Sequence, residues 1–243
     1  MNLEDKAVLV TGGGTGIGAA CAEILAKENC RVAVLGRRQE KLEQFSKTVD
    51  SKHPVKFRTC DVSDRENVRE SFGWFCEEFG RIDILINNAG VNIPNRAFDS
   101  VTPEDWDRLL QINATGTYNC IYFALPQMKK QKDGLIVNIS SIAGIRALLL
   151  GGAAYNASKF AMAALGITVG QEVKDEGIRV TNIYPGEVDT PILENRPTPV
   201  SAEHRAQILQ AEDIAAAVLM VAKLPPRANV WEMTIKPTTQ AFV

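Results

Sequence analysis

Tyr155 and Lys159 are the two residues whose types and spacing most directly suggest chemistry. They are four positions apart, so on a helix they lie on one face, one turn apart. A nearby ammonium stabilises the phenolate form of a tyrosine and lowers the pKa of its hydroxyl. Such a tyrosine can act as a general acid or base near neutral pH. The alternative is a solvated helix face, and the rest of the sequence decides between the two.

The composition is that of an ordinary globular protein. The chain has 243 residues, 45% of them apolar and 23% charged, with a net charge of −2. This length suits one large domain over residues 1–243, and the charge indicates neither a nucleic-acid nor a membrane partner. We expect no signal peptide and no membrane-spanning segment.

Cysteines and histidines indicate reduced thiols and no metal site. The five cysteines are scattered, odd in number and form no Cys-x-x-Cys pair, and the two histidines, His53 and His204, are far apart. This usage is typical of a cytoplasmic protein without disulfides.

Short apolar runs alternate with amphipathic stretches along the chain. Most of the runs are continuously apolar, which is typical of parallel strands buried on both faces. The alternation predicts an α/β, Rossmann-type, doubly wound parallel sheet of about seven strands with helices on both faces. The expected strands are 7–10, 31–35, 55–59, 82–86, 134–139, 178–184 and 231–235. The expected helices are 18–28, 39–51, 64–79, 103–130 (two helices or one kinked helix), 153–176 and 211–222.

Residues 191–210 are expected to form a substrate loop. Pro191, Pro197 and Pro199 mark the start of this segment as a loop. It follows an expected strand on the side where ligands bind in open α/β sheets. A plain surface excursion is the alternative.

A glycine-rich segment follows the first expected strand. Residues Thr11–Gly18 read Thr-Gly-Gly-Gly-Thr-Gly-Ile-Gly, a Gly-x-x-x-Gly-x-Gly pattern. Glycines permit a tight turn and a close approach to a pyrophosphate, which also meets the free N–H groups of the next helix. We therefore expect a dinucleotide phosphate site, with a flexible turn as the alternative. Its residues are Gly12, Gly14, Thr15, Gly16, Ile17 and Gly18.

The end of the second expected strand favours NADP over NAD. In NAD-binding sheets an acidic residue there holds the ribose 2′-hydroxyl, but this sequence has Arg37 and Arg38 after Gly36. A guanidinium suits a 2′-phosphate, whereas a carboxylate would repel it. The alternative is that the two arginines begin a solvated helix.

Further motifs follow in order along the chain. They are Cys60-Asp61-Val62, Asn87-Asn88-Ala89-Gly90, Ile112-Asn113-Ala114-Thr115-Gly116, Val137-Asn138-Ile139-Ser140-Ser141-Ile142-Ala143-Gly144 and Asn182-Ile183-Tyr184-Pro185-Gly186-Glu187-Val188-Asp189-Thr190. With the glycine segment and the Tyr155/Lys159 pair, they make the chain resemble the single-domain short-chain dehydrogenases/reductases from Lys6 to about Pro191. The C-terminal segment resembles the branch that contains serine 3-dehydrogenase and 3-hydroxy acid dehydrogenase-like enzymes.

The resemblance implies a role for each matching residue. Tyr155 would exchange a proton with the substrate oxygen, and Lys159 would lower the pKa of Tyr155 and contact the nicotinamide ribose. Ser141 would hydrogen-bond the substrate oxygen, as oxyanion donors do, and Asn113 would hold a water that links Lys159 to solvent. Capping for the serine and a locally satisfied polar group for the asparagine are the structural alternatives. The further cofactor contacts implied are Asp61, Val62, Asn88, Ala89, Gly90, Pro185, Gly186, Val188 and Thr190.

The segment between Ser141 and Tyr155 departs from the family pattern. It is one residue longer than is common, and it contains the adjacent leucines Leu148–Leu150. These leucines would form an apolar wall, an oligomer contact or buried core. The candidate substrate lining also includes Arg96, Arg146 and Glu187, a mixture that does not identify the substrate.

These observations predict an NADP(H)-dependent oxidoreductase that interconverts a small carbonyl compound and a secondary alcohol by hydride transfer. The alternative is a non-catalytic NADP-binding sensor or scaffold, although such relatives usually lose the Tyr or the Lys. By the same resemblance we expect a homo-oligomer, dimer or tetramer, that associates through the helices of 103–130 and 153–176.

Overall fold

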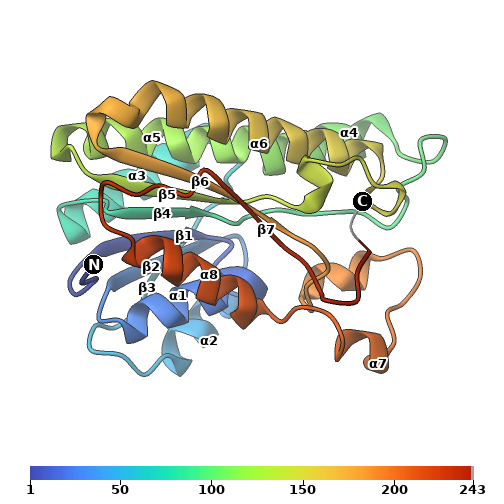
Figure 1. Ribbon diagram of the computed structural model, residues 1–243, viewed down its shortest axis with the longest axis horizontal. Helices are drawn as coiled ribbons and strands as arrows, with labels where there is room; N and C mark the ends of the chain where they lie inside the picture. Colours follow the sequence, from blue (N-terminus) through green and yellow to red (C-terminus); the bar gives the residue numbers. More distant parts are fainter. Residues whose placement is uncertain (242–243) are drawn as a thin grey trace.

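A seven-stranded parallel sheet forms the centre of the computed structural model, which describes residues 1–241 (Figure 1). Its order is β3-β2-β1-β4-β5-β6-β7, so the winding reverses between β1 and β4. This confirms the predicted doubly wound sheet, and such a reversal places a ligand crevice at the carboxyl ends of the strands. The strands are β1 (Ala7–Thr11), β2 (Arg31–Gly36), β3 (Lys56–Thr59), β4 (Ile84–Asn87), β5 (Gly134–Ile139), β6 (Ile178–Pro185) and β7 (Glu232–Ile235).

Helices cover both faces of the sheet. Figure 1 shows α4, α5 and α6 along one face and α1 and α8 along the other. None of the helices within residues 1–241 is long and apolar enough to cross a membrane. The helices are α1 (Gly16–Lys27), α2 (Gln39–Thr48), α3 (Arg65–Phe79), α4 (Pro103–Leu110), α5 (Gly116–Gln131), α6 (Ala153–Val173), α7 (Ala202–Arg205) and α8 (Ala211–Lys223).

The strands are apolar on both sides because each side faces a separate core. In β1, Val8 and Val10 pack into the core beneath α1 and α8. Ala7 and Leu9, which alternate with them, pack into the core beneath α3 and α5. All four side chains are fully buried, which accounts for the continuous apolar runs.

The region expected as helix 103–130 is continuous but irregular. A π-helical turn at Gln111–Thr115 joins α4 to α5, and it contains Asn113. Such turns insert one extra residue into a helix and frequently occur at functional sites. The short helix α7 (Ala202–Arg205) was not predicted and lies within the expected loop 191–210.

A ladder of buried asparagine amides crosses the three strands β4, β5 and β6. Asn87, Asn138 and Asn182 occupy paired positions, and each bond between neighbouring amides is 2.9 Å long. Asn182 Nδ2 then donates to the carbonyl of Ala163 in α6 at 3.0 Å. Gly166 leaves room for the ladder, since a Cβ there would lie 2.1 Å from Asn182 Oδ1. The ladder therefore docks α6 on these strands.

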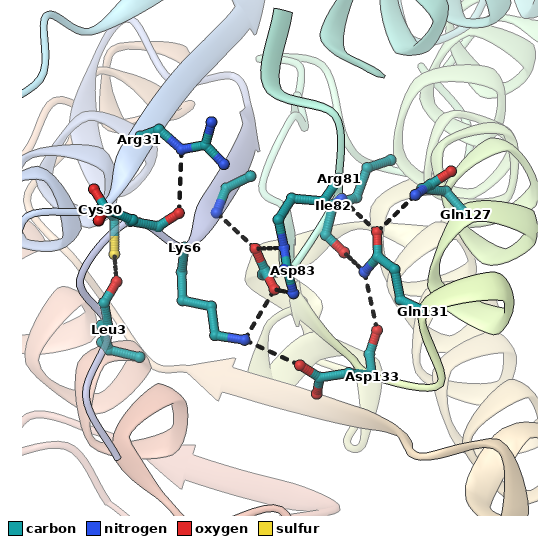
Figure 2. A network of polar contacts seen from close by, with 12 residues as sticks. Leu3, Lys6, Cys30, Arg31, Arg81, Ile82, Asp83, Gln127, Gln131 and Asp133 are labelled. Atoms are coloured by element: carbon teal, nitrogen blue, oxygen red, sulfur yellow. Dashed lines mark hydrogen bonds and ion pairs between the residues drawn. The ribbon is translucent and has the colours of Figure 1, made fainter. Parts of the chain in front are cut away.

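Asp83 joins three strands at the opposite, amino edge of the sheet (Figure 2). Its carboxylate accepts Lys6 Nζ at 3.0 Å, and the backbone N of Ala7 and Arg81 Nε at 2.8 Å each. Lys6 also pairs with Asp133 at 3.0 Å. Burial would raise the pKa of the Asp83 carboxyl, but the bonds from Arg81, Ala7 and Lys6 outweigh it and hold the pKa below its ordinary value.

Candidate functional site

A cleft of about 610 Å³ opens at the carboxyl edge of the sheet. It receives residues from the ends of β1, β2, β4, β5 and β6 and from the start of α6. Of the predicted site residues, Gly18 and Asn113 do not line it. Those that do are Gly12, Gly14, Thr15, Gly16, Ile17, Arg37, Arg38, Asp61, Val62, Asn88, Ala89, Gly90, Ser141, Tyr155, Lys159, Pro185, Gly186, Val188 and Thr190.

The glycine segment forms a tight turn with two left-handed residues, Gly12 (φ +64°) and Gly16 (φ +56°). Gly18 is required for a different reason, because a Cβ there would lie 2.4 Å from the carbonyl oxygen of Gly12. Asn88 braces the turn by donating Nδ2 to the carbonyls of Thr11 and Gly12 at 3.0 and 3.2 Å. Gly18 thus shapes the cleft without lining it.

The amino end of α1 fits a phosphate group. In the described chain, Thr15 at the N-cap makes no side-chain bond to the helix, and the first turn contains no acidic residue. The N–H groups of this turn and the positive end of the helix dipole therefore face the cleft uncompensated.

The two predicted 2′-phosphate arginines make different contacts. Arg38 Nη2 donates to Thr15 Oγ1 at 3.3 Å, which holds it beside the phosphate end. Arg37 Nη1 lies 4.0 Å from Asp61 Oδ2, and both of these side chains are substantially exposed. The structure thus brings together the predicted adenosine-binding residues Arg37, Arg38 and Asp61.

The structure distinguishes the two adjacent serines after β5. Ser141 lines the cleft with Tyr155 and is near enough to lower the pKa of the Tyr155 hydroxyl, and its Oγ accepts the backbone N of Ala143 at 3.1 Å. Ser140 instead donates Oγ to the backbone carbonyl of Lys159 at 3.2 Å. Ser141 therefore makes the capping contact considered as its alternative and also lies in the cleft, where its predicted bond to the substrate oxygen stays a prediction.

Although the segment between Ser141 and Tyr155 is one residue longer than is common, both residues line the same cleft. Leu148 packs with the small apolar cluster of Ile142, Leu150 lines the cleft, and Leu149 is 99% exposed. Two of the three leucines thus contribute to a wall of the cleft, and the middle one points to solvent.

Lys159 is buried without a carboxylate partner in the described chain. Lys159 is only 4% exposed, and its Nζ donates to the carbonyl of Ile139 at 3.0 Å. Burial disfavours the ammonium and lowers its pKa from 10.5 to about 8. Nζ lies 5.9 Å from the centroid of the Tyr155 ring.

We expected Lys159 to lower the pKa of Tyr155, but in the structure this pKa is raised. Burial of the phenol raises the pKa of Tyr155, while the nearby Ser141 side chain and the charge of Arg96 lower it in part. The net direction is upward because desolvation of the phenolate outweighs these two contacts.

Asn113 lies behind the cleft wall and is fully buried. Its Oδ1 accepts the backbone N of Val91 at 2.8 Å, and its Nδ2 donates to the carbonyl of Val91 at 3.0 Å and to Ser158 Oγ at 2.9 Å. These bonds fix the strand-end segment at Gly90, which lies between Asn113 and Lys159: a Cβ on Gly90 would be 3.3 Å from Asn113 Oδ1 and 3.5 Å from Lys159 Nζ.

Sequence reasoning missed residues that join the cleft from distant segments. Gln240 reaches it from beyond β7, where its Oε1 accepts the backbone N of Glu187 at 3.3 Å. Arg196 also lines the cleft and pairs with Glu187 at 3.3 Å. Arg146, expected in the lining, lies outside it. Throughout residues 1–241, no three His, Cys, Asp or Glu side chains gather as metal ligands.

The expected loop 191–210 folds back on the end of β6. Val188 and Leu209 form a parallel bridge, and Glu187 Oε2 contacts His204 Nε2 at 2.6 Å. Arg205 pairs with Asp189 at 2.6 Å. The first part of the segment, 191–196, lines the cleft.

Known proteins match nearly the whole chain. Residues 6–200 match the family model described as short chain dehydrogenase. An uncharacterised oxidoreductase of Staphylococcus saprophyticus is 36% identical over 239 residues, 98% of this chain and 99% of the relative. The closed form of serine dehydrogenase complexed with NADP+ has a TM-score of 0.89 at 29% identity, covering 97% of this chain and 96% of that one. A 3-ketoacyl-(acyl-carrier-protein) reductase of Brucella melitensis, complexed with NADH, has a TM-score of 0.89 at 25% identity, covering 97% and 98%.

The chain therefore belongs to the short-chain dehydrogenase family, a family of oxidoreductases. Its cleft is built from the motifs that carried the resemblance. The two structural neighbours hold NADP+ and NADH respectively, so the cofactor preference of this chain depends on its own residues.

Replacing Lys159 by Met should stabilise the protein near neutral pH. Because the pKa of Lys159 falls from 10.5 to about 8 on folding, burying the ammonium costs up to about 3 kcal/mol below pH 8. This cost declines as the pH rises from 8 toward 10.5, since the unfolded state then binds more protons than the folded state. Urea unfolding at pH 7 and about pH 10 measures the difference.

Lys130→Met is the matched control, because Lys130 is exposed on α5. It should change the free energy of unfolding little at either pH. A Lys159→Met variant that is less stable than wild type at neutral pH, or whose difference from wild type does not vary with pH, would contradict the assigned burial cost.

Proposed function

We propose that this protein is an NADP(H)-dependent oxidoreductase that interconverts a carbonyl compound and a secondary alcohol. The observation that carries the proposal is that Ser141, Tyr155 and the buried Lys159 line one cleft together with the glycine turn. When bound, the nicotinamide supplies or accepts the hydride. The chain's own residues supply position and a proton.

Tyr155 is the group proposed to exchange a proton with the substrate oxygen. Its raised pKa keeps it protonated, as a donor to a carbonyl oxygen requires. Ser141 is placed to donate a second hydrogen bond to that oxygen and so to stabilise the charge that develops there. In the oxidative direction, Tyr155 would first pass its own proton toward Lys159, and the resulting phenolate would then receive the proton of the alcohol.

Lys159 and Asn113 are proposed to complete the proton path. A lysine with a pKa of about 8 can gain or lose a proton near neutral pH. Asn113 fixes the Val91 backbone through two hydrogen bonds, and the adjacent Gly90 lies beside Lys159. The side-chain amide of Asn113 already makes three hydrogen bonds within the protein. In this proposal, the water that links Lys159 to solvent would therefore bind a backbone carbonyl of the π turn.

NADP is the proposed cofactor in preference to NAD. The support is the pair Arg37 and Arg38 at the end of β2, together with the contact of Arg38 with Thr15 at the phosphate end. Arg37 is only partly neutralised by Asp61 across 4.0 Å, so positive charge remains for a 2′-phosphate.

The remaining expectations belong to the same proposal. Residues 191–210 would act as a substrate loop over the cleft, and the protein would work in the cytoplasm, where its unpaired cysteines stay reduced. Self-association through α5 and α6 is supported by exposed aromatic side chains on these helices, Tyr118, Tyr122 and Phe160.

Tyr155→Phe should lower kcat by roughly 10²- to 10⁴-fold, because it removes the proton donor while keeping the ring. NADPH affinity should change by less than about twofold, since the hydroxyl is assigned to the substrate. Steady-state kinetics over a carbonyl panel and NADPH fluorescence titration provide the two readouts.

Tyr118→Phe, on the exposed face of α5, is the control and should keep full turnover. A protein that binds NADPH tightly, reduces nothing in the panel and is indifferent to Tyr155→Phe would instead be an NADP-binding sensor.

Arg37→Ala should raise the KM for NADPH by roughly 10- to 100-fold, the cost of one charge-assisted contact. The KM for NADH should change by less than about twofold, because NADH lacks the 2′-phosphate that Arg37 is proposed to contact. Arg31→Ala, at the amino end of the same strand, should leave the ratio of the two constants unchanged. Equal effects of Arg37→Ala on both cofactors would overturn the assignment of Arg37.

Light scattering should give the mass of two or four chains for the wild-type protein. Tyr122→Glu and Phe160→Glu should shift it toward one chain, because each places a charge on a surface expected to be buried between subunits. Phe98→Glu, at a side chain 81% exposed in the loop before α4, is the control and should not. A wild-type protein that runs as a single chain would remove this part of the proposal.

A further inference from the structure

Three segments from distant parts of the chain enclose the cleft beside Tyr155. The first follows β4 and includes Asn92 and Arg96, the second is the leucine-rich segment 145–152, and the third is 191–196 after β6. None of these segments belongs to the sheet. Their relative positions therefore depend on side-chain contacts between them.

Arg96 contacts all three segments through one guanidinium. Nε donates to the carbonyl of Ile93 at 2.5 Å, Nη1 to that of Leu150 at 2.8 Å and Nη2 to that of Asn195 at 2.8 Å. A guanidinium is planar and rigid, so these three bonds hold the three carbonyls at fixed mutual positions. A lysine, with one ammonium, cannot reproduce this geometry.

The backbone of Arg96 is also packed against the start of the helix that carries Tyr155. Gly152, the N-cap of α6, has φ +77°, and a Cβ there would lie 2.6 Å from both Cβ and the carbonyl oxygen of Arg96. Arg96 thus contacts α6 three residues before Tyr155, and its charge reaches the phenol.

Other side chains hold the leucine-rich segment, and Arg196 ties the third segment to Glu187 after β6. Asn92 Nδ2 donates to the carbonyl of Gly151 at 3.3 Å, and Asn156 Nδ2 donates to that of Leu148 at 2.9 Å. The link from these segments to Asn195 is the bond from Arg96. Loss of Arg96 would therefore remove this hydrogen bond between 191–196 and the other two walls, while the Arg196–Glu187 pair would still hold 191–196 to the end of β6.

We propose that Arg96 is a positioning residue that sets the width of the substrate opening beside Tyr155, and thereby selects carbonyl substrates by size. The inference rests on the proposed function, because it concerns the substrate side of the same cleft. It goes further by assigning selectivity to a residue that holds the walls by their backbone carbonyls. A short ketone would be enclosed by the fixed walls, whereas a bulky ketone would have to displace them.

Arg96→Gln should weaken selection for the short substrate. We expect the KM for a short aliphatic ketone to rise about tenfold, about 1.4 kcal/mol of lost enclosure by the walls, with a smaller change in kcat. The KM for a bulky aryl ketone should stay the same or fall. Arg96→Lys, which retains the charge but can hold fewer carbonyls, should be intermediate. NADPH affinity, measured by fluorescence, should change by less than about twofold.

Hydrogen exchange tests the clamp without requiring turnover. In Arg96→Gln, backbone amides of 148–151 and 193–196 should exchange faster, and those of 12–18 should not change. Arg146→Gln is the matched control, because Arg146 lies in the leucine-rich segment and does not line the cleft, and within residues 1–241 its guanidinium donates only to the neighbouring carbonyl of Ile145. It should alter neither exchange nor kinetics.

The outcomes separate the two proposals. Unchanged exchange in both segments would overturn the clamp, whether or not the enzyme turns over ketones. Faster exchange with an unchanged preference between short and bulky ketones would overturn the role in selectivity and leave Arg96 as a structural contact. A wild-type protein that reduces no ketone would defeat the proposed function and with it the role in selectivity, while the exchange measurement would still decide the clamp.

Discussion

The amide ladder of Asn87, Asn138 and Asn182 is the constraint on which the rest of the site depends. Parallel strands can shift in register only in steps that would break these side-chain bonds, so the ladder fixes where β4, β5 and β6 end. Those ends carry the Asn88–Gly90 segment, Ser141 and Pro185. The ladder also bonds the carbonyl of Ala163 in α6. It therefore fixes the position of the helix that carries Tyr155 and Lys159 relative to these strand ends.

Holding α6 in this place buries the Lys159 ammonium, which lowers stability but serves the proposed proton transfer. An ammonium buried against backbone carbonyls costs stability, since no carboxylate in the described chain compensates Lys159. The same burial brings its pKa to about 8, near the working range of a proton relay. A carboxylate partner would have stabilised the fold and raised that pKa out of range. The uncompensated charge is thus consistent with function being favoured over stability at this position.

Much of this arrangement follows from local sequence, and the remainder from distant contacts. The strands were predictable because burial on both faces leaves continuous apolar runs, and the glycine turn because its positive φ angles require glycine. The π turn at Asn113 was not, since α and π turns have the same apolar spacing over so few residues. Arg96 bonds carbonyls 54 and 99 positions away, and no local pattern encodes such partners. The raised pKa of Tyr155 was missed because it depends on burial rather than on its neighbour in the helix.

The Asp83 network lies at the amino edge of the sheet, on the far side from the cleft. It ties β1, β4 and β5 together with charged groups, whereas the carboxyl edge is built from glycines and loops that must admit ligands. The two edges can therefore change independently over evolution. Descendants of this chain could acquire new substrates by altering loops at one edge, while adaptation to heat or salt proceeds through the charges at the other.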